Sequence, residues 1–228
     1  MALIIAHRGA HSKAPENSLE AFKEAVKLKS YGIELDIHMT KDKKIIVMHD
    51  KNTKRMTGYD SEIKDLTLKQ IKELKLPDNG KIPTLQEAFD LIKDKSFYFI
   101  DLREYEALDE LIKIIRKNDM EKKVILSSDD IQILKRCYKL NKKIRLQFLA
   151  SSLIKKGIST EKIIAIANKY SAVLVSISGD VITKDMVDDI HKNNLQANSL
   201  IKEEDFKKVK SYGVDYVMSN YPDKLIII

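Results

Sequence analysis

Two carboxylates lie two positions apart in the strand-like segment Gly32–Asp36 and are the first candidates for chemistry. Residues two apart in a strand share a face, so Glu34 and Asp36 point the same way. Asp101 and Arg103 share a face in the same manner at the end of a later apolar run. Each acid alone more often caps a strand or pairs with a surface lysine, but three acids at strand ends favour a site. Carboxylate oxygens with room for water suit one divalent cation, Mg²⁺ or Ca²⁺, better than zinc.

Two histidines are expected around the same acidic residues. His7 directly follows the first strand-like segment and precedes Arg8, and His49 precedes Asp50. One histidine at a strand end is usually structural, whereas two around an acidic cluster suit an acid and base pair, because histidine titrates near neutral pH. Arg8 offers a planar fork of donors for phosphate oxygens, and Gly9 permits a tight turn after the strand. With a divalent cation, these residues predict phosphoester hydrolysis.

The other histidines and the cysteine give weaker signals. We expect structural roles for His11 and His38, and a surface position for His191 on a late helix. Cys137 is the one cysteine of the chain, which excludes an internal disulfide and a cysteine-based zinc site. Because it lies among apolar residues of a helical segment, we expect it to be buried rather than catalytic.

Strand-like runs alternate with amphipathic helical segments along the whole chain. The expected strands are Leu3–Ala6, Gly32–Asp36, Phe97–Leu102, Val124–Ser127, Arg145–Phe148, Val173–Ile177, Leu195–Leu200 and Asp215–Ser219. The expected helices are Ser18–Lys29 (with Asn17 as N-cap), Thr84–Lys93, Ala107–Lys117, Ile131–Leu140, Thr160–Lys169, Lys184–Asn193 and Glu203–Tyr212. This order predicts a TIM-type (β/α)8 barrel, in which acids at the C-terminal ends of strands converge on one mouth. A doubly wound open sheet is the alternative.

One segment breaks the alternation. Ile45–His49 is another strand-like run. Only the short segment Thr40–Lys44 separates it from the run that contains the second strand. A parallel crossover needs about a dozen connecting residues, so the two runs cannot be parallel neighbours. A hairpin turn at Thr40–Lys44 would instead return His49 to the neighbourhood of Asp36. We therefore expect a barrel with an extra hairpin after its second strand.

Length and composition fit one globular domain over residues 1–228. The chain has 41 Lys+Arg against 34 Asp+Glu, a net charge of +7, but the lysines are interspersed with acids. This mixture indicates a solvated surface and predicts no nucleic-acid binding. No apolar run approaches the roughly 18 residues of a membrane helix, and the first one is too short for a signal-peptide core. We expect a cytoplasmic protein without stable membrane insertion, and no pattern indicates an oligomeric state.

The spacing of several motifs resembles the glycerophosphodiester phosphodiesterase family over nearly the whole chain. The matching segments are His7-Arg8-Gly9, Ala14-Pro15-Glu16-Asn17-Ser18, Glu34-Leu35-Asp36, His49-Asp50, Arg55-Met56-Thr57-Gly58, Ile82-Pro83-Thr84-Leu85-Gln86-Glu87, Gly213-Val214-Asp215 and Tyr221-Pro222-Asp223. The resemblance implies a TIM-type barrel and metal-dependent cleavage of glycerophosphodiesters to glycerol 3-phosphate and an alcohol.

The same resemblance implies roles for individual residues. The matched positions are the acid/base pair His7 and His49, the phosphate-contacting Arg8, the metal ligands Glu34 and Asp36, and the site-lining pair Glu16 and Asn17. The third metal ligand and a following lysine correspond here to Asp101 and Arg103, which keep the charges and change the side-chain lengths. Asp101 is one methylene shorter than the glutamate of the family, and Arg103 offers a fork in place of a point charge.

Two more departures concern the substrate. An aromatic residue of the family on the seventh strand aligns with Asn198, and an acid before Tyr221 aligns with Asn220. If Asn198 lines the substrate wall, these changes predict looser selectivity and a more polar or anionic substrate. Two alternatives remain open, a phospholipase-type enzyme of the same barrel superfamily and a non-catalytic binding protein. The polar segment Tyr59–Lys64 offers no apolar loop for docking on a membrane, and all the catalytic charges are present.

Overall fold

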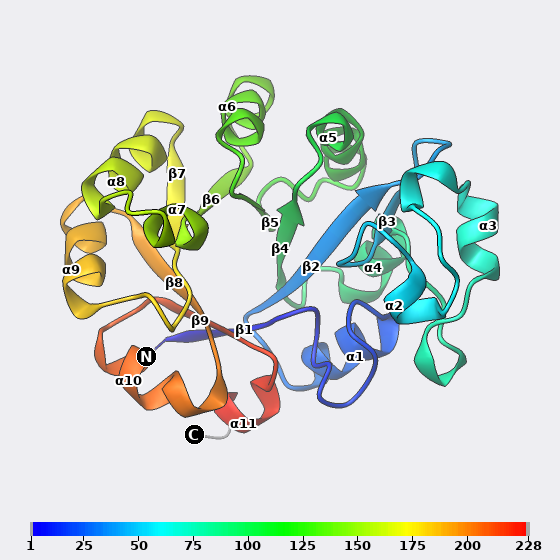
Figure 1. Ribbon diagram of the computed structural model, residues 1–228, viewed down its shortest axis with the longest axis horizontal. Coiled ribbons are helices and arrows are strands. Elements are labelled where there is room, and N and C mark those ends of the chain that lie inside the picture. Colours follow the sequence, from blue (N-terminus) through cyan, green and yellow to red (C-terminus); the bar gives the residue numbers. More distant parts are fainter. Residues whose placement is uncertain (1, 227–228) are drawn as a thin grey trace.

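The computed structural model describes residues 2–226 and contains nine strands in the order β1-β9-β8-β7-β6-β5-β4-β2-β3 (Figure 1). The strands are β1 Leu3–Ala6, β2 Gly32–Met39, β3 Ile45–Val47, β4 Phe97–Leu102, β5 Val124–Ser128, β6 Arg145–Leu149, β7 Ala172–Ser176, β8 Gln196–Ile201 and β9 Tyr216–Ser219. A parallel pairing between β1 and β2 closes eight of them into a barrel. The predicted TIM-type barrel is confirmed, and the open-sheet alternative is wrong.

Helices surround the barrel and follow most of its strands (Figure 1). They are α1 Leu19–Lys27, α2 Lys54–Thr57, α3 Leu68–Glu73, α4 Leu85–Ile92, α5 Leu108–Lys117, α6 Ile131–Leu140, α7 Ser151–Lys155, α8 Thr160–Lys169, α9 Lys184–Lys192, α10 Phe206–Ser211 and α11 Pro222–Ile226. Short 3₁₀ helices lie in the connections, η1 Ile63–Asp65, η2 Pro77–Asn79, η3 Tyr105–Ala107 and η4 Glu203–Asp205. The short helices α2, α3, α7 and α11 were not expected, because four to six residues carry little periodic signal.

The alternation of side chains along β2 separates the core from the site. Ile33, Leu35 and Ile37 are buried in the main apolar core between sheet and helices, while Glu34 and Asp36 face the barrel interior. Burying each of these apolar side chains stabilises the fold by about 1.5–3 kcal/mol. The carboxylates are thus held in place by a strand that is anchored through its opposite face.

The expected hairpin is present. Strand β3 pairs antiparallel with β2, with Ile37 opposite Val47, and the amide of Met48 donates to the carbonyl of Asp36 over 3.0 Å. Ile46 and Met48 are buried in a second apolar cluster with residues of the η1–α3 region. The hairpin therefore fixes the backbone next to His49 against the strand that carries the acids.

The start of α1 corrects one detail of the sequence-based prediction. Ser18, not Asn17, is the N-cap, and its hydroxyl accepts a hydrogen bond from the amide of Ala21. Asn17 has φ +55, outside the helix, and its side chain is directed to Asp36 instead. The turn between β1 and α1 requires Gly9, which has φ +82 and where a Cβ would lie 2.8 Å from Ala21.

Two further expectations concern burial and membranes. Cys137 is buried inside α6, and burial raises the pKa of its thiol to about 12, as expected for a residue without a catalytic role. Within residues 2–226, no helix combines the length and the apolar character needed to cross a bilayer.

Candidate active site

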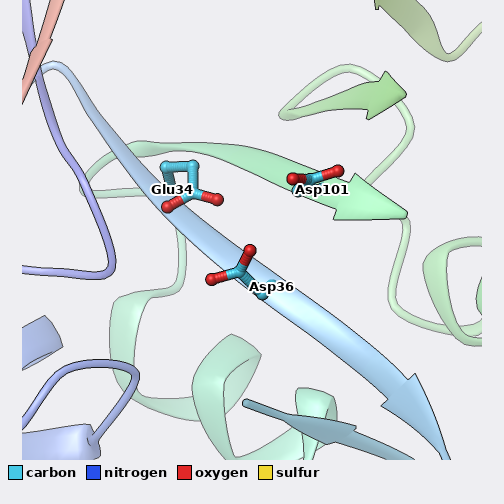
Figure 2. A group of neighbouring side chains, drawn as sticks. All are labelled: Glu34, Asp36 and Asp101. Carbon is cyan, nitrogen blue, oxygen red and sulfur yellow. The ribbon is translucent and has the colours of Figure 1, made fainter. Parts of the chain in front are cut away.

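Three carboxylates from two neighbouring strands converge inside the barrel mouth (Figure 2). Asp36 on β2 and Asp101 on β4 are register partners, so their side chains leave the sheet side by side. One oxygen from each of Glu34, Asp36 and Asp101 lies within 4.8 Å of the other two, and all three residues are buried. The shorter aspartate at position 101 therefore still reaches the other two acids.

The electrostatics of this acidic cluster fit a bound divalent cation. Burial raises the pKa of Glu34 well above its usual range, and the nearby charges of Asp36 and Asp101 raise it further. Burial also raises the pKa of Asp101 to about 6, although Arg103 opposes the rise. Oδ1 of Asp101 is buried without a hydrogen-bond partner among the described residues. A divalent cation would remove the repulsion and satisfy this oxygen, so the cluster fits a metal site of oxygen ligands.

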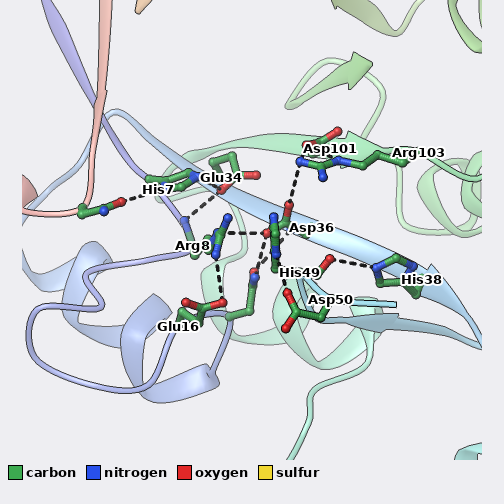
Figure 3. A network of polar contacts seen from close by, with 12 residues as sticks. His7, Arg8, Glu16, Glu34, Asp36, His38, His49, Asp50, Asp101 and Arg103 are labelled. Carbon is green, nitrogen blue, oxygen red and sulfur yellow. Dashed lines mark hydrogen bonds and ion pairs between the residues drawn. The ribbon is translucent and has the colours of Figure 1, made fainter. Parts of the chain in front are cut away.

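His7 follows β1 and is held between a neutral amide and the acidic cluster (Figure 3). Its Nδ1 lies 2.6 Å from Oδ1 of Asn220, and its Nε2 lies 3.8 Å from Glu34. Because an amide oxygen only accepts, Nδ1 is the donor, and Nε2 is left free toward the acids. Burial, together with the charge of Arg8, lowers the pKa of His7 to about 4.

His49 has a charged partner instead. Its Nδ1 donates to Oδ1 of Asp50 over 2.6 Å. Arg55 donates to both oxygens of Asp50, at 2.5 and 3.1 Å, and this contact lowers the pKa of Asp50 to about 2. His38, expected to be structural, is buried with its Nε2 3.1 Å from the backbone oxygen of His49. The ring and the backbone of His49 are therefore both held.

A set of polar contacts through Glu16, Asn17 and Arg8 connects the acidic cluster to Arg55, which holds the partner of His49. Nη1 of Arg8 donates to Glu16 over 2.9 Å, and its Nε lies 3.3 Å from Asp36. The same Oε1 of Glu16 accepts from Arg55 over 2.6 Å. Asn17 donates to Oδ2 of Asp36 over 2.9 Å. The expected site residues that follow β1 or lie on β2 are thus joined in one network of polar contacts (Figure 3).

Arg103 separates two unequal cavities. An inner cavity of about 210 Å³ contains His7, Arg8, Glu34 and Asp101, and extends over Ser127, Gln147, Leu149, Ser151, Ser176, Ser178, Leu200 and Met218. An outer basin of about 580 Å³ is lined by His38, His49, Asp50, Lys51, Asn52, Lys54, Arg55 and Arg103. Arg103 lines both spaces and donates to Oδ2 of Asp101 over 2.9 Å. A group bound at the acidic cluster would therefore have one histidine on each side.

Known proteins share this sequence and this fold. The model of the glycerophosphoryl diester phosphodiesterase family matches residues 7–224. The chain belongs to this family. A glycerophosphodiester phosphodiesterase of Caldanaerobacter subterraneus is 32% identical, with 98% of this chain and 96% of the relative covered. A relative from Bacillus altitudinis with the same name is 29% identical and covers all of this chain.

Two solved structures have the same architecture. A crystal structure of the glycerophosphodiester phosphodiesterase from Thermotoga maritima has a TM-score of 0.85 at 27% identity, with 99% of this chain and 97% of that chain covered. An Oleispira antarctica phosphodiesterase, solved with the product sn-glycerol-3-phosphate, has a TM-score of 0.87 at 23% identity, with 98% and 95% covered. The family match and the named relatives show that this chain is a phosphodiesterase, and the solved structures show that its fold is a TIM-type barrel.

Asn198 does not lie where the comparison of motifs placed it. It is fully buried and donates to Oε1 of Gln147 over 3.0 Å, while Leu200, two residues on, lines the inner cavity. Gln147 in turn donates to Ser127 over 3.0 Å. Asn198 therefore belongs to a polar layer beneath the cavity, and the wall that it was expected to form is made by Leu200.

Sequence reasoning gave no role to Asp50, Arg55 or Gln147. The motif Arg55-Met56-Thr57-Gly58 was the available signal for Arg55, but its spacing says nothing of the residues that it contacts. Gln147 had no signal, since it is one polar residue in an otherwise ordinary strand. His191 is exposed on α9 as expected, where it pairs with Asp215.

Proposed function

We propose that the protein hydrolyses glycerophosphodiesters to glycerol 3-phosphate and an alcohol, with a histidine acid/base pair and one divalent cation. The observation that carries this proposal is the buried carboxylate triad with His7 in the cavity on one side and His49 in the basin on the other. The glycerol 3-phosphate bound by the Oleispira antarctica phosphodiesterase supports a product of this class.

Glu34, Asp36 and Asp101 are the proposed ligands of the cation, and their oxygens favour Mg²⁺ or Ca²⁺. When bound, the cation would neutralise phosphate charge and polarise a phosphoryl oxygen. Arg8 and Arg103 border the same space and would hold the other phosphate oxygens with their planar donor groups. Glu16 and Asn17 keep Arg8 and Asp36 in position.

The partners of the two histidines favour different roles. Asp50 is a carboxylate that accepts a hydrogen bond from Nδ1 of His49, and a negatively charged partner of this kind suits the acid that gives a proton to the leaving alcohol. Asn220 is neutral and holds Nδ1–H of His7, so Nε2 keeps its lone pair and suits the base that takes a proton from the attacking hydroxyl. This assignment places the glycerol in the inner cavity and the alcohol in the outer basin.

The inner cavity fits a small polar moiety. Its far side is lined by four serine hydroxyls and the Gln147 amide, and its volume of about 210 Å³ is below the roughly 300–1,000 Å³ of drug-sized ligand sites. Hydroxyl and amide groups can bond the hydroxyls of a glycerol without adding charge. The small cavity, with uncharged polar groups beyond the acidic cluster, supports a glycerophosphodiester without fatty acyl chains as the substrate of this single barrel domain. We also propose a cytoplasmic location.

The test is a panel of glycerophosphodiesters assayed for release of glycerol 3-phosphate, with and without Mg²⁺ or Ca²⁺. We expect metal-dependent release of glycerol 3-phosphate from several of them. Binding of these diesters without any turnover, in the presence of either cation, would favour the non-catalytic alternative.

A further inference from the structure

The outer basin on the His49 side has a marked excess of positive charge. Four cationic side chains line it, and one acid does, Asp50. Both oxygens of Asp50 already accept hydrogen bonds from Arg55, so this carboxylate offers little to a cationic ligand. With a volume of about 580 Å³, the basin is also the larger of the two spaces next to the acidic cluster.

Lys51 and Lys54 are the cations of the basin that are free to meet a ligand. Lys51 makes no ion pair with any residue in the range 2–226. Lys54 pairs with Asp60 over 2.8 Å, but both side chains are more than half exposed. Exposed ion pairs of this kind contribute little to stability, so the Lys54 ammonium can leave Asp60 for a more strongly charged partner.

The basin lacks what a cationic alcohol would need. Quaternary ammonium groups are typically bound over the faces of Trp, Tyr or Phe rings, and none of the described residues that line the basin is of these three types. A choline or ethanolamine group would therefore meet an excess of like charges among the side chains that line the basin. An anionic group would meet the ammonium groups of Lys51 and Lys54.

We propose that the outer basin binds the departing alcohol of the substrate, and that this alcohol carries a second anionic group such as a phosphate. The inference rests on the proposed function, since it takes the acidic cluster and His49 as the place where the diester is cleaved. It adds a class of substrate, a glycerophosphodiester with a polyanionic head group, that the names of the family and of the relatives do not specify.

A matched pair of substrates tests the charge alone. Glycerophosphoinositol and glycerophosphoinositol 4-phosphate differ by one phosphomonoester, and glycerophosphocholine adds the opposite charge; all three are scored by release of glycerol 3-phosphate. We expect kcat/KM to be roughly three- to tenfold higher for the 4-phosphate than for glycerophosphoinositol at low salt, the effect of one or two exposed ion pairs. The preference should shrink as added salt screens the charges.

The double variant Lys51→Gln, Lys54→Gln removes the two charges and keeps the side-chain length. It should bring the ratio of kcat/KM for the two inositol substrates close to one, whereas Lys162→Gln, an exposed lysine on α8, should leave the ratio unchanged. A wild-type ratio near one, or a ratio that survives in the double variant, would overturn the inference and leave the proposed function standing. No glycerol 3-phosphate from any of the three substrates would overturn the proposed function and this inference with it.

Discussion

The Nδ1 atom of His7 lies 2.6 Å from the side-chain oxygen of Asn220, 213 residues further along the chain. This contact is a product of barrel closure, because β1 and β9 are parallel neighbours with Ala6 opposite Ser219. The residues that follow these partners must then emerge together at the mouth. His49, by contrast, takes its partner Asp50 from the next position in the chain. The two histidines therefore have partners of different charge, which is the basis for giving them different roles.

We expect His7→Ala and His49→Ala each to lower turnover by about 10²–10⁴-fold, the usual contribution of a general acid or base. His191→Ala is the matched control, because His191 is exposed on α9, and it should turn over at close to the wild-type rate. Circular dichroism and the melting temperature check that each variant folds. Near-normal turnover in His7→Ala or His49→Ala would remove that residue from the mechanism.

Removal of divalent cations should abolish activity, and Mg²⁺ or Ca²⁺ should restore it. Because the cation would bind the folded protein, it should also raise the melting temperature. Asp101→Ala should lose both effects, whereas Asp101→Glu should keep more activity, since it keeps a carboxylate and matches the longer side chain of the family. Asp109→Ala, an exposed acid at the start of α5, is the control. Full activity in excess chelator would contradict a metal site at the acidic cluster.

Arg55 is expected to act by positioning other residues rather than by touching the reacting atoms. It donates to Asp50, the partner of His49, and to Glu16, the partner of Arg8. We expect Arg55→Met to lower kcat by more than tenfold with a small change in KM, and Arg55→Lys to restore part of the loss. Because exposed ion pairs contribute about 0–1 kcal/mol, the melting temperature should fall only slightly, by about as much as in Asp50→Asn, which loses the same contact. A fall in activity that parallels a fall in stability would instead indicate a purely structural role.

The pKa of Asp50 predicts how its contribution to stability varies with pH. Hydrogen bonds from Arg55 lower this pKa from 3.8 to about 2 in the folded protein. A lowered carboxyl pKa stabilises the fold above the unfolded value and ceases to do so as the pH falls through the folded value. We therefore expect the urea midpoint of Asp50→Asn to lie below that of the wild type at pH 6, and the difference to shrink as the pH falls from 4 toward 2. A difference that stays constant over this range would exclude the titration of Asp50 as its source.

The fold was predictable because each strand carries a short apolar run and most are followed by an amphipathic helix. The observed strands begin within one residue of the predicted ones, and β2 continues three residues beyond Asp36, to Met39. The convergence of Glu34, Asp36 and Asp101 was predictable for the same reason, since strand periodicity sets the face of each side chain and barrel closure brings the strand ends together.

Contacts between loops were not predictable from periodicity. The bonds of Arg55 to Asp50 and Glu16 depend on how the α2 segment folds back over the turn after β1, which no local pattern encodes. Asn17 showed the same limit. Its residue type favours a helix cap, but the carboxylate of Asp36, 19 residues away, provides a stronger partner. The buried hydrogen bond to Asp36 therefore outweighs the preference of asparagine for a helix cap.

The last prediction concerns the wall of the inner cavity. Strand periodicity puts Asn198 and Leu200 on the same face of β8, but it does not give their depth in the barrel. In the structure the deeper Asn198 is enclosed and bonded to Gln147, and Leu200 lines the cavity two residues further toward the mouth. A group bound in the cavity can therefore contact Leu200, whereas Asn198 can act only by supporting Gln147.

We accordingly expect Leu200→Ala and Leu200→Phe to raise the KM for glycerophosphocholine, glycerophosphoethanolamine and glycerophosphoglycerol by similar factors, with little loss of stability, because the inner cavity is the proposed site of the glycerol that the three substrates share. Asn198→Ala should lower the melting temperature, because it leaves the buried Oε1 of Gln147 without its donor, at a cost of about 1–3 kcal/mol. It should leave the KM for the three substrates close to that of the wild type. The opposite pattern, with KM values that respond to Asn198→Ala and not to either variant of Leu200, would place Asn198 in the substrate wall after all.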